Sequence, residues 1–149
     1  MSGSRINGRV KVAFYCYLLT LLLLAVFGLI YLFRSEFMPY HAVAVGQSWA
    51  DLEPAFQILI LGLMRVIGGN LLATAFAIGI ILFGPFRQGA RWSYWAIPII
   101  GLLSSVATLY ATLYVDRNTP ASAPWMAAAL GVVLLVLGFI LSVAPEPDR

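Results

Sequence analysis

The residue with the clearest chemical potential is Arg65, because it stands inside an otherwise hydrocarbon-compatible stretch that runs from residue 54 to 86. A charged side chain at membrane depth costs about 2.5–3.5 kcal/mol on insertion scales, so a partner is expected to satisfy it. Gln57 precedes Arg65 by eight residues and falls on the same helical stripe. We therefore expect an outward-facing polar pocket in which Arg65 holds an anionic headgroup or a carboxylate. The alternative is an arginine that only fastens its helix to a neighbour, and its candidate counter-charges are Glu36, Asp51, Glu53 and Asp116.

Asn70, His41 and Trp49 complete the set of candidate ligand-binding residues. A histidine can act as a base, a ligand or a pH sensor. With His41 as the single histidine and Cys16 as the single cysteine, these residues cannot form a bis-histidine haem site or a zinc site within one chain. We expect no metal and no cofactor, and we interpret His41 as an interfacial side chain. No catalytic set is predicted, and His41 is the sole candidate for a catalytic base.

Several familiar signatures are missing from the chain. It contains no Walker A loop, dinucleotide fingerprint, H-E-x-x-H or G-x-S-x-G. It also has no CxxC and no basic, aromatic surface pattern typical of nucleic-acid binding. The sequence therefore favours a non-enzymatic protein and predicts no nucleic-acid partner.

Composition identifies the environment in which these residues must be positioned. Hydrophobic residues make up 62% of the 149-residue chain and charged residues 10%, with a mean hydropathy of +0.93. A soluble domain has about 25% charged residues. The apolar runs are long enough to cross a bilayer core of about 30 Å. We predict a single all-α transmembrane domain, 1–149, folded as a four-helix bundle with helices at about 12–34, 52–84, 93–115 and 123–143.

A short amphipathic outer loop is expected between the first two helices. Pro39 disfavours helix at the residue before it, and His41, Val45 and Trp49 are spaced to share one face of an interfacial helix. Ser48 or Asp51 is expected to cap the second helix, and Gly84-Pro85 to end it. Whether that helix breaks near residues 68–70 is left open.

Basic residues predict the topology. They gather before the first helix and in the second loop, whereas the first and third loops carry one each: Arg5, Arg9, Lys11, Arg87 and Arg91 against Arg34 and Arg117, with Arg149 in the tail. The positive-inside rule then places both termini in the cytoplasm of a multi-pass inner-membrane protein.

Small and weakly polar residues are expected to govern helix packing. Gly62, Gly68 and Gly69 lie close to Arg65 on the second helix and would allow a neighbour to approach closely. The third helix carries a stripe that is expected to face this groove and to hydrogen-bond across it, namely Ser104, Ser105, Thr108 and Thr112.

The stretch LGLMRVIGGNLLA at residues 61–73 contains an R-x-x-G-G-x-x-L-A pattern. Its members are Arg65, Gly68, Gly69, Leu72 and Ala73. Together with the four-helix layout, this pattern resembles small bacterial membrane proteins of the DoxX-like kind and their relatives. The resemblance implies the helix count and a bacterial inner membrane, and it implies no reaction.

Three functions are compatible with these observations. The first is a non-enzymatic membrane protein that binds a lipid or a hydrophobic or anionic ligand near Arg65, or serves as an accessory subunit. The second is a small transporter or channel with Arg65 and Asn70 lining the path. The third is a lipid-modifying enzyme that uses His41 and Arg65. Membrane lipids are the expected partners, together with further copies of the chain or a larger membrane complex.

Overall fold

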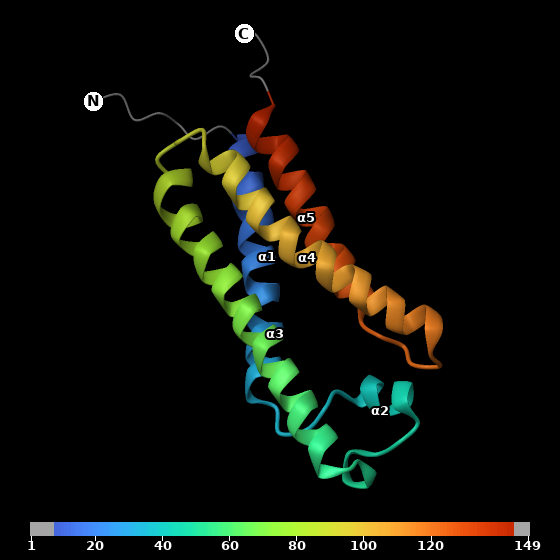
Figure 1. Ribbon diagram of the computed structural model, residues 1–149. Coiled ribbons are helices and arrows are strands. Elements are labelled where there is room, and N and C mark those ends of the chain that lie inside the picture. The colour runs from blue at the N-terminus through green and yellow to red at the C-terminus, as the bar shows by residue number, and fades with distance from the viewer. Residues whose placement is uncertain (1–7, 145–149) are drawn as a thin grey trace, which may run out of the picture.

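The computed structural model describes residues 8–144, and within that range it is all-helical (Figure 1). Four helices are long and apolar enough to cross a membrane. They are α1 (Gly8–Phe33), α3 (Pro54–Ile81) with its continuation η2 (Leu82–Phe86), α4 (Ser93–Asn118) and α5 (Trp125–Val143). The short helix α2 (Pro39–Val45) and the 3₁₀ turn η1 (Trp49–Asp51) lie between α1 and α3. The predicted four-helix membrane bundle with a short helical loop is confirmed.

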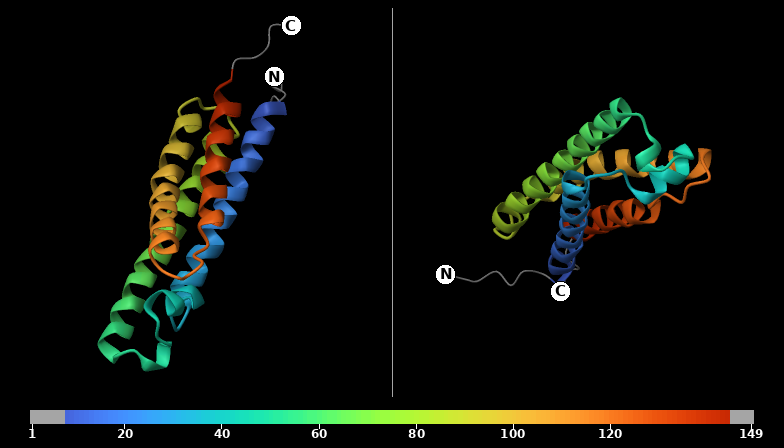
Figure 2. Two further views of the ribbon diagram at one scale, coloured as in Figure 1. Left: turned by 90° about the vertical axis from the view of Figure 1, so that its right-hand side faces the viewer. Right: turned by 90° about the horizontal axis from the view of Figure 1, so that it is seen from below.

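The four long helices are arranged around α1. This helix packs against both α3 and α5, and α4 packs mainly on α5, so that α3–α4 is the sparsest of the four neighbouring helix pairs. One end of the bundle, here called the termini end, holds the start of α1, the turn from η2 into α4, and the end of α5 (Figure 1). Toward the opposite end, here called the α2 end, α3 diverges from α4 and α5, and α2 lies in the gap (Figures 1 and 2).

The termini half of the bundle has a closed apolar core. Tyr17, Ile78, Leu82, Ile97 and Leu135 contribute from all four long helical segments, and each is fully buried. Burying a side chain of this size stabilises by about 1.5–3 kcal/mol when water is the reference. In lipid the gain comes instead from close packing between the helices. This core fixes the termini half and leaves the α2 half free to diverge.

A close backbone approach joins α1 to α3. A Cβ atom added to Gly68 would lie 2.6 Å from the Leu32 nitrogen and 2.7 Å from the Gly28 carbonyl oxygen. Only glycine fits where two helix backbones come so near. The helix continues unbroken through residues 68–70, so the question left open by the sequence is answered.

Two predicted boundaries of α3 are wrong. Gly84-Pro85 does not end the helix, which continues through the π-helical turn η2 with Pro85 inside it. A π turn changes the local hydrogen-bond register, so the proline's missing N–H and its ring are tolerated there. At the other end the residue before the first turn is Glu53, and Pro54 occupies the first turn. The Ser48 hydroxyl donates instead to the Asp51 carboxylate, at 2.6 Å.

Candidate functional site

A cavity of about 660 Å³ lies at the α2 end, where α3 and α4 diverge. Its volume is typical of a small-molecule site, for which about 300–1,000 Å³ is usual. All five α-helices contribute to a lining that is mostly apolar. The chief apolar members are Leu24, Phe27, Phe37, Leu63, Met64, Ile67, Leu71, Ala107, Ala111, Ala127 and Ala128.

The helix α2 is fixed over this cavity by aromatic and hydroxyl contacts. The Phe37 ring is buried and packs edge-on against the Trp49 ring, with their centroids 5.0 Å apart. The hydroxyls of Tyr31, at the end of α1, and Tyr40, on α2, share a hydrogen bond of 2.7 Å. Gly46 ends α2 in the left-handed conformation (φ 70°), where glycine carries no Cβ penalty. The segment therefore forms a defined cap.

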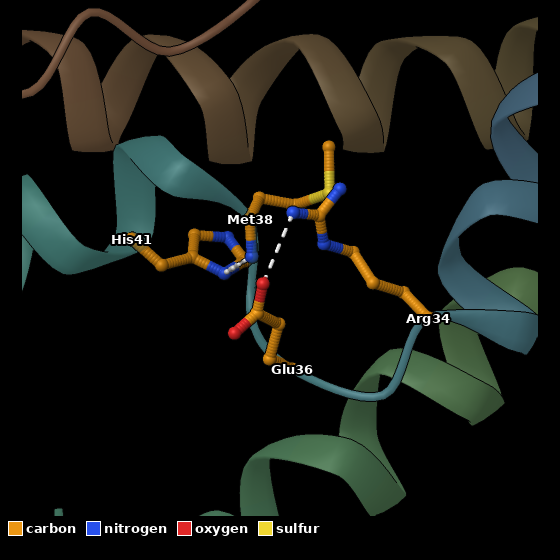
Figure 3. A network of polar contacts seen from close by, with 4 residues as sticks. All are labelled: Arg34, Glu36, Met38 and His41. Atoms are coloured by element: carbon orange, nitrogen blue, oxygen red, sulfur yellow. Dashed lines mark hydrogen bonds and ion pairs between the residues drawn. The ribbon is translucent and has the colours of Figure 1, made fainter. Parts of the chain in front are cut away.

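His41 stands at the cap with a defined tautomer. The Met38 backbone N–H donates to His41 Nδ1 at 3.3 Å (Figure 3). The His41 backbone N–H donates to the Met38 carbonyl at 2.8 Å. Because Nδ1 accepts, the proton of the neutral imidazole is on Nε2. Burial lowers the pKa of His41 below its ordinary value of 6.5 and favours that neutral form. His41 thus offers a neutral N–H donor in the cavity lining.

The acid nearest to His41 in sequence is engaged elsewhere. Arg34 Nη2 and Glu36 Oε1 form an ion pair of 3.6 Å (Figure 3). Among residues 8–144 the structure shows no hydrogen bond from the His41 ring to a carboxylate, and no group of three or more His, Cys, Asp or Glu residues able to hold a metal ion. The arrangement lacks the acid that would orient a histidine base.

The polar groups inside the cavity are neutral. Asn70 contributes an amide, and α4 contributes a run of hydroxyls, Ser104, Ser105, Thr108 and Thr112. The prediction that this stripe hydrogen-bonds across the groove is wrong for its two threonines. Thr108 donates to the Ser104 carbonyl and Thr112 to the Thr108 carbonyl, each at 2.9 Å and within α4. In the described part of the chain, no Asp, Glu, Lys or Arg lines the cavity.

The structure separates the predicted site residues into two groups. His41, Asn70, Ser104 and Thr108 line the cavity, whereas Arg65 does not. Arg65 is exposed and comes two residues before the cavity-lining Ile67, so the two side chains point in nearly opposite directions around α3. The expected pocket around Arg65 is therefore corrected to one on the opposite flank of that helix.

Gln57 and Trp49 support the cap from outside the cavity. Gln57 Nε2 donates to the Trp49 carbonyl at 2.7 Å and to the Leu52 carbonyl at 3.2 Å. The amide is therefore committed to holding η1 against the start of α3. Within residues 8–144 it forms no hydrogen bond with Arg65. The expectation that Trp49 shares one helix face with His41 is also wrong, because the turn at Gly46 separates α2 from η1.

The three predicted packing glycines behave differently. Gly68 makes the α1 contact, whereas a Cβ on Gly62 or Gly69 would meet no atom within 4 Å. Gly62 and Gly69 therefore contribute no close approach within the described chain. Sequence reasoning also missed Phe37 and the Tyr31–Tyr40 pair. The sequence offered one signal for the cavity itself. Small residues on α4 recur at spacings of three and four, which indicates a helix face with room beside it.

Comparisons with protein-family models, with curated proteins and with solved structures find no match for this chain. The likeness to DoxX-like proteins thus stays a resemblance of pattern. The site must be interpreted from its own geometry.

Proposed function

We propose that this chain is a non-enzymatic membrane protein that binds a neutral, largely hydrophobic molecule in the α2-capped cavity. The observation that carries the proposal is the cavity of about 660 Å³, whose lining is apolar with uncharged hydrogen-bonding groups. Transferring a charged group into such a lining without a counter-charge costs several kcal/mol. The chemistry therefore favours a neutral lipid over the anionic ligand expected near Arg65.

A lateral entrance supports a ligand that comes from the bilayer. Ile67 on α3, and Ala107 and Ala111 on α4, line the cavity and are also exposed. Because these residues lie on membrane-spanning helices, their exposed faces meet lipid. A hydrophobic molecule can enter there without crossing water.

The closed core favours binding over conduction. The fully buried side chains Tyr17, Ile78, Leu82, Ile97 and Leu135 occupy the termini half of the bundle. A hydrated path would have to pass through this apolar packing. The missing acid partner of His41 likewise gives the enzyme hypothesis no support.

The proposed location is a bacterial inner membrane with both termini in the cytoplasm. Arg9, Lys11, Arg87 and Arg91 belong to the termini end, whereas the α2 end carries Arg34 and Arg117 together with four acids, Glu36, Asp51, Glu53 and Asp116. The positive-inside rule supports this orientation. The cavity then opens toward the outer leaflet.

The test compares a neutral and an anionic lipid that share one acyl chain. Purified full-length protein is incubated with monoolein or with oleate, and retention is measured by native mass spectrometry. We expect monoolein to be retained and oleate to be lost. Ala107→Trp should lower monoolein retention roughly tenfold, the equivalent of about 1.4 kcal/mol. Val106→Trp is the matched control, because Val106 is exposed on the same helix and does not line the cavity.

Two results would overturn the proposal. One is equal retention by both tryptophan variants, which would show that binding occurs outside the cavity. The other is a preference for oleate, which would show that the uncharged lining does not select the ligand.

A further inference from the structure

A second cavity, of about 410 Å³, lies at the termini end of the bundle. Two elements line it. The first turns of α1 contribute Val10, Lys11, Phe14 and Tyr15, and the η2 segment contributes Phe86 with Arg87 directly after it. It shares no lining residue with the α2-capped cavity.

The π turn η2 ends on a buried aromatic residue, Phe86. Phe86 is buried at 3% exposure, and its ring packs edge-on against Tyr17 at 5.6 Å and against Tyr94 at 5.2 Å between centroids. The Phe14 ring lies 6.4 Å from it. These aromatic rings make a fixed apolar floor. π turns within helices are frequent at functional sites, because they change the direction of the side chains that follow.

A turn closed by backbone hydrogen bonds holds Arg87 at the edge of this floor. The Gln88 N–H donates to the Gly84 carbonyl at 3.2 Å, and the Ala90 N–H donates to the Pro85 carbonyl at 3.0 Å. Gly89 adopts φ 75°, which glycine accepts without strain. The arginine backbone is therefore positioned before any ligand arrives.

The two cations at this cavity lack compensation within the described chain. Lys11 and Arg87 are both exposed, and the structure records no ion pair for either among residues 8–144. The four acids in that range all belong to the α2 end. Two positive side chains from separate elements thus border an apolar cavity at the membrane surface.

We propose that this second cavity binds the phosphate of an anionic phospholipid headgroup. Arginine matches phosphate oxygens with paired N–H donors, and lysine adds a compact point charge. Basic pockets between transmembrane helices on the cytoplasmic side recognise such headgroups. The apolar floor of Phe14 and Phe86 accommodates the glycerol and the first acyl carbons, which a free phosphate lacks. The occupant is therefore a lipid of the leaflet at the termini end.

The test uses full-length protein in nanodiscs of phosphatidylcholine doped with phosphatidylglycerol, and it counts lipids retained on release by native mass spectrometry. We expect selective retention of phosphatidylglycerol. The double variant Lys11→Gln/Arg87→Gln should reduce it by roughly fivefold for each charge removed. The control Arg9→Gln/Arg91→Gln removes the same charge from the termini end, at residues that do not line the cavity.

The possible results distinguish a local lipid site from other causes of phosphatidylglycerol retention. An equal loss in both double variants would assign the retention to the diffuse positive surface and overturn the site. Competition by millimolar inorganic phosphate would show that free phosphate suffices and would overturn the lipid assignment. Unchanged thermal unfolding and monoolein retention in Lys11→Gln/Arg87→Gln would show that the loss is not caused by misfolding. If those two properties fell together with phosphatidylglycerol retention, the local site would be refuted.

Discussion

Gly68→Ala tests the close approach of α1 and α3 that defines the bundle. A Cβ at this position would lie 2.6 Å from the Leu32 nitrogen and 2.7 Å from the Gly28 carbonyl oxygen. Both atoms belong to backbone and cannot rotate away, so α1 has to retreat by about 0.8 Å to restore an ordinary 3.4 Å contact. A gap of that width forfeits a quarter to a half of the dispersion attraction between facing atoms. We expect the free energy of unfolding to fall by about 2 kcal/mol, within the usual cost of overpacking.

The adjacent glycine provides the control. A Cβ on Gly69 would meet no atom within 4 Å, so Gly69→Ala should leave stability unchanged or raise it by up to about 1 kcal/mol through alanine's helix preference. Gly28→Ala should fall between the two, because its nearest obstacle is the flexible Leu72 side chain at 2.8 Å. The assay is the fraction of protein that remains monodisperse in detergent after heating. If Gly69→Ala were as costly as Gly68→Ala, the assignment of the buried face of α3 would be refuted.

Two further predictions concern the cap and the exposed arginine. The hydrogen bond from the Met38 N–H to His41 Nδ1 requires a neutral imidazole. Because burial lowers the pKa of His41, this bond is fully present above about pH 6.5 and is lost as the pH falls through the window below that value. Trp49 fluorescence and monoolein retention should change in that window for the wild type and not for His41→Gln, which keeps a cap acceptor without titrating. A pH response that survived in His41→Gln would show that His41 is not the group that titrates. Arg65→Ala should change stability by no more than about 0.5 kcal/mol and leave monoolein retention intact, as measured by the same heating and mass-spectrometry assays. A large loss of monoolein retention in Arg65→Ala would show that Arg65 belongs to the binding site.

The sequence predicted the helices far better than their mutual orientation. Long apolar runs require spans, so the number of helices followed from composition and length alone. The end of α3 was missed because Gly84-Pro85 is a stop signal for an α-helix, and the π turn that accommodates Pro85 has no comparable local signature. The Tyr31–Tyr40 contact was missed for a different reason. It joins two elements whose approach depends on how α2 folds back over the bundle.

Which of the two adjacent glycines, Gly68 or Gly69, contacts α1 determines which residues of α3 line the cavity. Arg65 precedes Gly68 by three residues and Leu71 follows it by three, so these two side chains stand about 60° to either side of Gly68 on the helix. Leu71 is buried and lines the cavity, which places Arg65 on the other flank. Periodicity placed Arg65 and the glycines on one side of α3, but it could not show which glycine meets α1. A buried Gly69 would have turned the helix by about 100° and changed the lining of the cavity.

The position of Arg65 along the membrane normal explains why its charged side chain can be exposed on the outside of the bundle. Arg65 lies 21 residues before Phe86, which is about 31 Å along a helix, close to the thickness of the hydrocarbon core. With Arg87 marking one membrane surface, Arg65 falls near the opposite one, even though apolar residues continue to Pro54. A long arginine stem can then carry its charge to the headgroup level while its carbons remain in the apolar region. An arginine in this position needs no buried counter-charge, which agrees with the small effect expected for Arg65→Ala.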